Sequence, residues 1–329
     1  MRYRPSLLVV PFLAFTLSLR VATGQSASPS SGRLYFLSLA DHGRVESVNP
    51  DGTDLEILSS GKADGPDGIV VDPQSKKVYW TNMGKVSLDD GSVQRIDLDG
   101  SNLTTVVPKG GAFTPKQLKL DAKHGKLYWS DREGMHIMRS NLDGSNVDTL
   151  VVTGKGNEAR KDAANWCVGM ALDVEGGTVY WSQKGNGGDG RIFRANMEIP
   201  KGQTATDRKD IEVLFDGLPE PIDIDLDLSR RIMYWSDRGD PPRGNTVNRA
   251  PMDMPKGADP KHRTDQEILV RGLQEGIGIA LDLRGGHMYY TDLGGNIYSA
   301  NLDGSNNKTI LTGQGELTGI TWVDLAYVK

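Results

Sequence analysis

The feature that most constrains this chain is a pair of adjacent aromatic residues that recurs six times. The pairs are Tyr35-Phe36, Tyr79-Trp80, Tyr128-Trp129, Tyr180-Trp181, Tyr234-Trp235 and Tyr289-Tyr290. Five copies carry an aspartate seven positions before the pair, at Asp72, Asp121, Asp173, Asp227 and Asp282. The interval between pairs drifts from 44 residues (35 to 79) to 55 residues (234 to 289). A constant offset inside a drifting interval indicates one structural unit repeated with loops of varying length.

Each unit has the same internal order. A short β-branched apolar run ends in the aspartate, a polar turn follows, and then come the aromatic pair and a further strand. In three units that strand ends in the sequence Leu-Asp-Gly-Ser-Asn, at residues 98–102, 142–146 and 302–306. An Asp-Gly turn between short apolar runs is a strong hairpin signal, because glycine accepts the positive φ that such turns require. The pattern predicts four strands per unit, which is the blade of a β-propeller.

The two ends of the repeat region complement each other. The first aromatic pair has no apolar run before it, and the final run, residues 319–324, has no pair after it. We therefore expect the C-terminal strand to complete the first blade, which removes the long unpaired edges of an open sheet. The prediction is an all-β, six-bladed β-propeller that forms a single domain over residues 32–329.

The N-terminal segment has the features of an export signal. Residues 1–4 are basic, residues 6–19 are mostly apolar, and residues 22–24 offer small side chains at a cleavage site. Residues 1–24 are predicted to be a signal peptide and residues 25–31 a flexible lead-in, so the mature protein is expected to be secreted without a transmembrane segment. The alternative is an N-terminal membrane anchor.

Export makes two further predictions possible. Asn102 and Asn307 each begin an Asn-x-Thr sequence at a hairpin turn, and both are expected to carry N-linked glycans. Cys167 is the only cysteine, so no disulfide forms within the chain, and we expect it to be a buried packing residue. The net charge of −5 and the lack of a basic stripe argue against a nucleic-acid partner.

The entrances of the inner strands can be aligned by counting back from the repeat aspartate. Four positions back stand Gly68, Gln117, Gly169, Asp223 and Gly278, so Gln117 and Asp223 depart from glycine. A residue that recurs from blade to blade is expected to serve the blade, as with the aspartate after the aromatic pair at Asp131, Asp237 and Asp292. A polar or unusual residue found in one blade is a better functional candidate. The single-blade residues are Lys116, Gln117, Asn165, Trp166, Glu220 and Asp223; Asp67, Gln274, Glu275 and Thr318 lie at the same entrances.

The loops on this face differ in length. Those at 82–92, 154–165, 183–190 and 237–245 are long, which predicts a walled pocket there. The alternative for each polar residue is that it only solvates the mouth of the channel. On the opposite face, residues 197–202 and 252–257 share the pattern Met-x-x-Pro-Lys-Gly and replace the simple turn in two adjacent blades. We interpret them as an internal duplication with a structural or partner-binding role.

The sequences at 128–131, 234–237 and 289–292, together with the Leu-Asp-Gly-Ser-Asn turns, resemble the YWTD propellers of the lipoprotein-receptor family. Those receptors flank the propeller with cysteine-rich modules. A cysteine-poor propeller with an export signal and glycosylation sites is more similar to the glycosylated hetero-Diels–Alderases of fungal tropolonic sesquiterpene pathways. This second resemblance rests on overall character and on no short catalytic motif.

The second resemblance implies a reaction without a metal or redox cofactor. A tropolone carbinol would lose water to give a quinone methide, which would add to an alkene of a humulene-type macrocyclic sesquiterpene. Our hypothesis for this reaction is that Lys116 or Gln117 donates to the tropolone oxygens and that Glu220 or Asp223 handles the proton. Phe113 and Trp166 would form an apolar wall.

Two other functions remain open from the residues. A metal-dependent lactonase would need oxygen ligands, which could come from Asp67, Asn165, Glu220, Asp223 and Glu316. The five histidines and the single cysteine show no zinc-site spacing, and no metal ligand is assigned. A non-catalytic propeller would instead present its loops to a secreted partner, and a fold alone does not decide between these functions.

Overall fold

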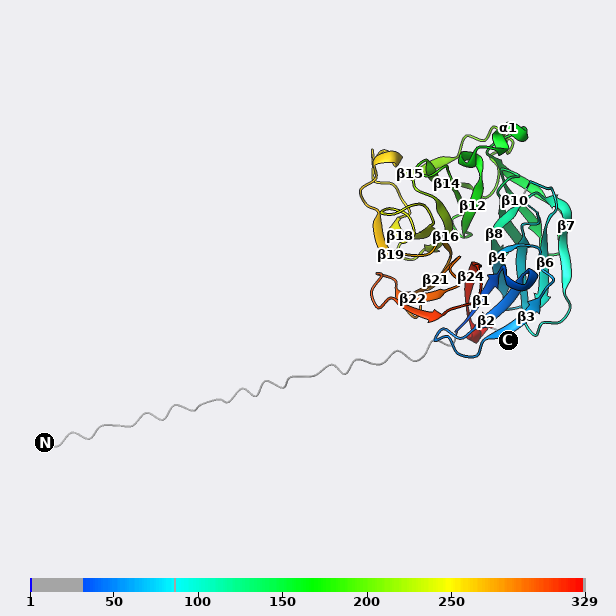
Figure 1. Cartoon of the computed structure of the whole chain (residues 1–329). Helices are drawn as coiled ribbons and strands as arrows, with labels where there is room; N and C mark the ends of the chain where they lie inside the picture. Colours follow the sequence, from blue (N-terminus) through cyan, green and yellow to red (C-terminus); the bar gives the residue numbers. More distant parts are fainter. Residues whose placement is uncertain (2–31, 86, 328–329) are drawn as a thin grey trace.

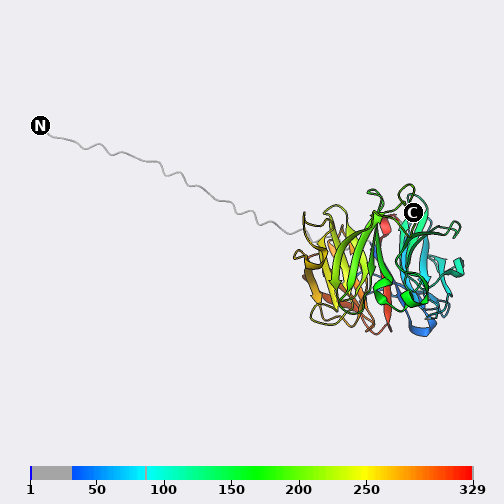
Figure 2. The same cartoon turned by 90° about the horizontal axis from the view of Figure 1, so that it is seen from above.

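A computed structural model describes residue 1 and residues 32–85 and 87–327, and shows a ring of six four-stranded antiparallel sheets (Figure 1). Figure 2 shows the same ring turned by 90°. The six-bladed all-β architecture is thus confirmed. The predicted signal peptide and lead-in lie outside the described residues. Within the described part of the chain, no helix has the length and apolar character needed to cross a bilayer.

The blades share one strand order, from the central channel outward. The inner strands are β4 (Pro66–Asp72), β8 (Pro115–Asp121), β12 (Cys167–Asp173), β16 (Pro221–Asp227), β20 (Gly276–Asp282) and β24 (Leu317–Asp324). The second strands, which carry the aromatic pairs, are β1 (Gly32–Ser38), β5 (Lys77–Asn82), β9 (Lys126–Asp131), β13 (Thr178–Gln183), β17 (Ile232–Asp237) and β21 (His287–Asp292).

The two outer positions complete each blade. The third strands are β2 (Arg44–Val48), β6 (Gly91–Asp97), β10 (His136–Asn141), β14 (Gly190–Asn196), β18 (Thr246–Pro251) and β22 (Ile297–Asn301). The outermost are β3 (Glu56–Ser60), β7 (Thr104–Ala112), β11 (Asp148–Val152), β15 (Glu212–Leu218), β19 (Glu267–Arg271) and β23 (Lys308–Leu311). Helical turns are short: α1 (Gly156–Arg160), η1 (Ala40–His42), η2 (Ala163–Asn165), η3 (Pro260–His262) and η4 (Leu325–Tyr327).

The ring closes as the sequence predicts. Strand β24 pairs antiparallel with β1, with Tyr35 opposite Thr321 and Phe36 opposite Ile320. In Figure 1 the red C-terminal strand lies beside the blue N-terminal strand. Blade one is therefore β24-β1-β2-β3, and blades two to six follow in chain order from β4 to β23.

The aromatic pairs join each blade to both of its neighbours. Successive residues of a strand point to opposite faces, so the two rings of a pair enter different interfaces. Tyr180 packs with Trp235 of blade five, while its neighbour Trp181 packs with Tyr128 of blade three. All four of these side chains are at most 2% exposed. The core is thus distributed between blades, which explains why the pair recurs as a unit.

The hydroxyl residue after each pair forms a second link between blades. The hydroxyl of Ser182 donates to the carbonyl of Ile222 in the next inner strand at 2.7 Å and accepts from the N–H of Gly169 at 2.8 Å. The same donation to the following inner strand is made by Thr81, Ser130, Ser236 and Thr291. These side chains satisfy backbone groups at the channel edge, where the inner strand has no further strand partner.

The repeated aspartates serve the backbone, which confirms their predicted role. After the aromatic pair, Asp131 accepts the N–H groups of Phe113 and Thr114, each at 2.7 Å. Asp237 accepts that of Glu220 at 3.0 Å, so these aspartates fix the loops that lead into the inner strands. Burial raises the pKa of Asp131 to about 6 and that of Asp237 to about 7.

The connections that follow the duplicated segments lie over the outer edges of the preceding blades. Arg208 follows the first segment, residues 197–202, and its side chain is fully buried. It donates to the carbonyl of Leu150 on β11 at 2.9 Å and forms an ion pair with Asp210 at 2.7 Å. Arg263 follows the second and donates to the carbonyl of Leu214 on β15 at 3.2 Å. An edge strand left open invites pairing with another chain, and these arginines occupy its carbonyls.

Candidate functional site

The entrance face is the end of the ring where the inner strands begin. Here Lys116 and Gln117 of β8 converge on Asp67 of β4. The ammonium of Lys116 forms a short ion pair with one carboxylate oxygen of Asp67, and the Gln117 amide donates to the other at 3.2 Å. Burial lowers the pKa of Lys116, although the charge of Asp67 opposes the shift. The structure therefore brings three of the sequence-predicted residues into one hydrogen-bonded cluster.

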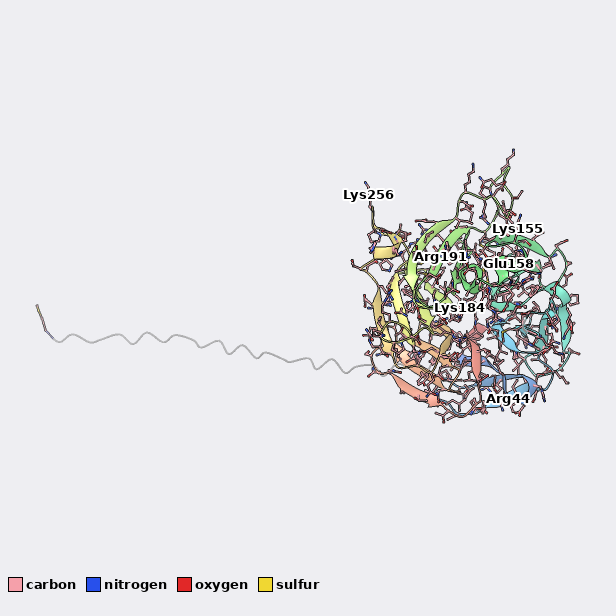
Figure 3. All side chains as sticks on the ribbon, turned by 45° about the horizontal axis from the view of Figure 1, so that its top comes forward. Arg44, Lys155, Glu158, Lys184, Arg191 and Lys256 are labelled. Carbon is pink, nitrogen blue, oxygen red and sulfur yellow. The ribbon has the colours of Figure 1, made fainter. Side chains whose placement is uncertain are left out.

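The two aromatic residues predicted as an apolar wall are each covered by cations. The Arg160 guanidinium lies over the ring of Phe113 at 4.1 Å. Trp166 has Arg132 at 5.2 Å from its ring centre and Lys184 at 6.0 Å, and its indole N–H donates to the Arg160 carbonyl. The wall is thus a layer of cations stacked on aromatic rings, a stabilising arrangement. The loop that leads to Trp166 carries α1 and η2. Figure 3 shows Lys184 near the centre of the ring, and Lys155 and Lys256 at its periphery.

Glu220 belongs to a chain of charges on the same face. Lys184 binds it at 2.9 Å and Arg238 at 3.4 Å, and Arg238 also pairs with Glu275 at 2.9 Å. A pocket of about 380 Å³ opens among Glu220, Arg238, Glu275 and the loop residues Gly188 and Asn245. Two of the four long loops, 183–190 and 237–245, line this pocket, whereas the loops at 82–92 and 154–165 do not contribute to it.

Three other residues predicted from the sequence make structural hydrogen bonds, within a loop or between neighbouring strands. The Asn165 amide donates to the Ala159 carbonyl at 2.9 Å, which closes the loop around α1. The Gln274 N–H donates to Asp292 at 3.0 Å. The buried hydroxyl of Thr318 donates to the carbonyl of Pro66 at 2.9 Å and links blade one to blade two.

Asp223 lies deeper, in the channel. Its carboxylate accepts the N–H of Ile279 in the neighbouring inner strand at 3.2 Å and faces the ammonium of Lys119 at 3.6 Å. Burial raises its pKa to about 6. Asp223 is separated from Glu220 by an apolar plug formed by Val168, Ile222 and Ile277, whose side chains are buried. The two carboxylates predicted to share a role therefore lie in different environments.

The oxygen-bearing residues considered for a cation do not converge. Asp67, Glu220 and Asp223 each face a different lysine. Among residues 32–85 and 87–327, no group of three or more histidine, cysteine or acidic residues is placed to hold a metal ion. Cys167 is fully buried, as predicted, and burial raises the pKa of its thiol to about 12.

Several residues of this region escaped sequence reasoning. Arg132, Arg160 and Lys184 sit in loops whose paths the repeat does not specify. Lys119 and Asp225 could have been found, because the equivalent inner-strand positions carry small or apolar residues in the other blades. Those residues are Val70, Ala171, Ala280 and Thr321.

The glycosylation candidates are both exposed at turns. The Asn102 amide donates to Asp97 at 2.8 Å, and the Asn307 carbonyl oxygen accepts from the Tyr290 hydroxyl at 2.5 Å.

These motifs and the closed ring define a six-bladed β-propeller of the YWTD type. No family model matches the chain. A Pyricularia oryzae protein named low-density lipoprotein receptor-related protein 1 is 44% identical over 313 residues, covering 91% of this chain and 100% of that protein. The chain therefore belongs to the family of this fungal low-density lipoprotein receptor-related protein.

A second relative is longer. The 3-hydroxyacyl-CoA dehydrogenase-like protein LAM1 of Cochliobolus heterostrophus is 44% identical over 253 residues, which are 75% of this chain. The match spans about half of that relative, 53% of its length.

Solved structures support the fold alone. The propeller in a nidogen–laminin complex matches with a TM-score of 0.68 at 21% identity, over 88% of this chain and 98% of that chain. A gluconolactonase from Xanthomonas campestris matches with a TM-score of 0.57 at 14% identity, over 87% of this chain and 86% of that chain.

Proposed function

We propose that the entrance face catalyses dehydration of a tropolone carbinol to a quinone methide and its stereoselective hetero-Diels–Alder addition to a humulene-type sesquiterpene. The observation that carries this proposal is the half-buried Lys116, held by Asp67 and Gln117 beside cation-covered aromatic rings. A tropolone is a flat ring rich in oxygen. Stacking on Trp166 and hydrogen bonding to an ammonium group would suit both properties.

The reaction balances without an added reagent. The tropolone hydroxyl gives up its proton and the hydroxymethyl carbon loses hydroxide, so one water leaves and a heterodiene remains. The heterodiene and one alkene of the macrocycle then form one C–C and one C–O bond, closing a dihydropyran ring. The proposed chemistry calls for a proton-transfer group, a donor to the quinone-methide oxygen and a surface that orients the two partners.

The roles can be distributed over the entrance face. Lys116 donates to the oxygen of the quinone methide, and Asp67 and Gln117 fix its position. Glu220 is the better of the two carboxylates for the proton, because it lines the entrance pocket while Asp223 lies below the apolar plug. Trp166 and Phe113, with Arg132 and Arg160 over their rings, form the surface on which the tropolone lies.

Chiral product analysis tests the proposal. Glycosylated protein is mixed with a hydroxymethyl tropolone and a humulene-type alcohol, with and without a chelator, beside a protein-free control. We expect one enantiomer to form faster than in the control, with the same rate when chelator is present. A slow mixture identical to the control would refute the proposal for these substrates, and a rate abolished by chelator would redirect it to a metal-dependent enzyme.

A further inference from the structure

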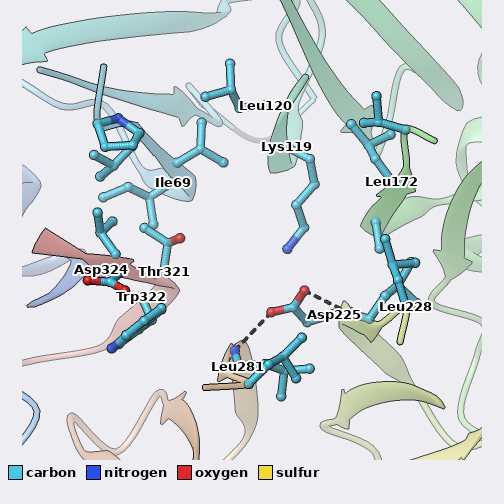
Figure 4. A pocket seen from close by; sticks show the side chains of 18 of the residues that line it. Ile69, Lys119, Leu120, Leu172, Asp225, Leu228, Leu281, Thr321, Trp322 and Asp324 are labelled. Atoms are coloured by element: carbon cyan, nitrogen blue, oxygen red, sulfur yellow. Dashed lines mark hydrogen bonds between the residues drawn. The ribbon is translucent and has the colours of Figure 1, made fainter. Parts of the chain in front are cut away.

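A large cavity lies at the exit face of the ring, where the inner strands end, and none of the functions considered above uses it. It has a volume of about 660 Å³, within the range of small-molecule sites. All six inner strands contribute to it, and its walls are mostly apolar (Figure 4). The main wall residues are Leu120, Leu172, Leu226, Leu281, Leu283 and Trp322. We call this cavity the exit bowl.

The inner end of the exit bowl is polar. Figure 4 shows the ammonium of Lys119 and the carboxylate of Asp225 pointing toward each other across it. Asp225 accepts the N–H groups of Leu226 at 2.9 Å and Leu281 at 3.0 Å, one on each oxygen. Each carboxylate oxygen has a second lone pair, and a lysine ammonium has three donors. Lys119 pairs with Asp223 at 3.6 Å, so both Lys119 and Asp225 retain hydrogen-bonding capacity toward the bowl.

The charges of Lys119 and Asp225 are not needed to form a blade. At the position of Lys119 and Asp225, the other four blades have Val70, Ala171, Ala280 and Thr321 and still form the same sheets. Burial works against the ammonium of Lys119, but the charges of Asp223 and Asp225 outweigh it and raise the lysine pKa. Burial also raises the pKa of Asp225. A lysine between the buried carboxylate of Asp223 and the half-buried carboxylate of Asp225 is costly to bury, and its presence in one part of the ring calls for a reason other than folding.

The exit bowl is separate from the entrance site. Val168, Ile222 and Ile277 pack together at the entrance end of the channel, each at most 5% exposed. Below them, Lys119 and Asp223 span the channel. A ligand in the bowl would therefore lie at the opposite end of the inner strands from Glu220.

We propose that the exit bowl binds an uncharged, apolar alcohol of terpenoid size. A hydroxyl group is uncharged, and it can accept from Lys119 and donate to Asp225 at the same time. A carboxylate ligand would meet Asp225 and Asp223, and an amine would meet Lys119. The leucine walls and the Trp322 ring cover the hydrocarbon part. This inference does not depend on the proposed reaction at the entrance face.

Four ligands with one carbon skeleton test the proposal. Borneol, camphor, bornylamine and bornane carry a hydroxyl, a carbonyl, an ammonium and no polar group, respectively. Their dissociation constants for the full chain are measured by ligand-observed NMR titration. We expect borneol to bind at least about tenfold more tightly than the other three, a difference of about 1.4 kcal/mol. Tighter binding of bornylamine would refute the assignment of an alcohol, and no saturable binding of borneol would refute the site.

Two variants locate the binding. Lys119→Met should weaken borneol about tenfold and remove its advantage over bornane. Lys119→Met leaves the carboxylates of Asp223 and Asp225 without their cation and can affect folding, so a second variant is needed. Leu283 is 42% exposed at the rim of the exit bowl. In Leu283→Trp the larger side chain narrows the mouth of the bowl without changing its charges. Leu55→Trp is the matched control, at an exposed leucine outside the bowl. Equal borneol affinity in Leu283→Trp and Leu55→Trp would overturn the location.

Lys116→Met separates this inference from the proposed function. It should abolish most turnover at the entrance face and leave borneol binding unchanged. Loss of borneol binding in Lys116→Met would place the ligand at the entrance and overturn the exit-bowl proposal, whatever the outcome for turnover.

Discussion

The hydroxyl of Ser182 lies 2.7 Å from the carbonyl oxygen of Ile222 and joins the second strand of blade four to the inner strand of blade five. It also accepts the N–H of Gly169, so one small side chain satisfies backbone groups of two blades. Four other blades have the same link, made by serine or threonine. The position after the aromatic pair thus connects blades as directly as the pair does.

Ser182→Ala should lower the free energy of unfolding by about 1–3 kcal/mol, because a buried carbonyl and a buried N–H lose their partner. Denaturant unfolding followed by tryptophan fluorescence measures the change. Ser305→Ala removes a hydroxyl from an exposed turn and should change stability by no more than about 0.5 kcal/mol. Similar losses in both variants would show that the link has no special importance.

Arg208→Met should destabilise the protein by about 3–5 kcal/mol, since the change strands the Asp210 carboxylate and the carbonyls of Leu150 and Asn196. Lys201→Met, at the exposed turn that precedes Arg208 in the chain, is the control. Light scattering after partial heating provides a second measurement, because an uncovered β11 edge favours association. An Arg208 variant as stable and monomeric as the control would contradict the role of the Arg208 connection as a cover.

The pKa of Asp223 predicts a pH dependence of stability. Burial raises it to about 6 in the folded chain, against about 3.9 in an unfolded one. The folded state therefore binds more protons between these values, so this group's contribution to stability is present below pH 4 and is lost as the pH rises through about 6. Asp223→Asn should flatten the stability profile between pH 4 and 7. A profile with an unchanged slope would mean that the Asp223 pKa is close to normal.

Glu220→Gln and Asp223→Asn should separate the two carboxylates considered for proton transfer. If Glu220 moves the proton, Glu220→Gln lowers the dehydration rate by about 10²–10⁴-fold. Asp223→Asn should then change stability more than turnover. The measurement is quinone-methide formation from the carbinol in single-turnover experiments. Full activity in both variants would remove both residues from the mechanism.

We propose that the chain is exported and glycosylated at Asn102 and Asn307. Expression in a fungal host should give secreted protein that begins near residue 25, and glycosidase treatment should lower its mass. Asn102→Gln and Asn307→Gln should each remove one glycan in intact-mass analysis. Asn307→Gln should also reduce stability slightly, because the Asn307 oxygen accepts from Tyr290. Retention of residues 1–24 on a membrane-bound product would favour the anchor alternative.

Much of the fold could be predicted because the same sequence pattern occurs in several copies, which shows which positions are structural. Six copies of the aromatic pair were enough to count the blades, and the unmatched final strand was enough to predict closure. The repeat aspartates were recognised as structural for the same reason. Ser182 and its counterparts were missed, because a serine or threonine in a strand has no sequence signal that distinguishes a link between blades from a solvent-facing side chain.

The candidate site was harder to predict. Lys116, Gln117 and Asp67 converge because two neighbouring inner strands bring them to the same level of the channel, as their alignment indicated. The cations over Phe113 and Trp166 come from loops, whose paths depend on their own hydrogen bonds. The exit bowl escaped prediction because its walls are ordinary leucines, and only their joint arrangement creates the space.

The pairing of β24 with β1 also bears on how the protein is made. A ribosome delivers β1 first among the strands of the ring and β24 after all the others, so blade one has three strands while blades two to six are already complete. A chain cut short before β24 keeps the edge of β1 open and lacks the contacts of both flanking blades. The fold of the ring can therefore be completed only after residues 317–324 have been synthesised.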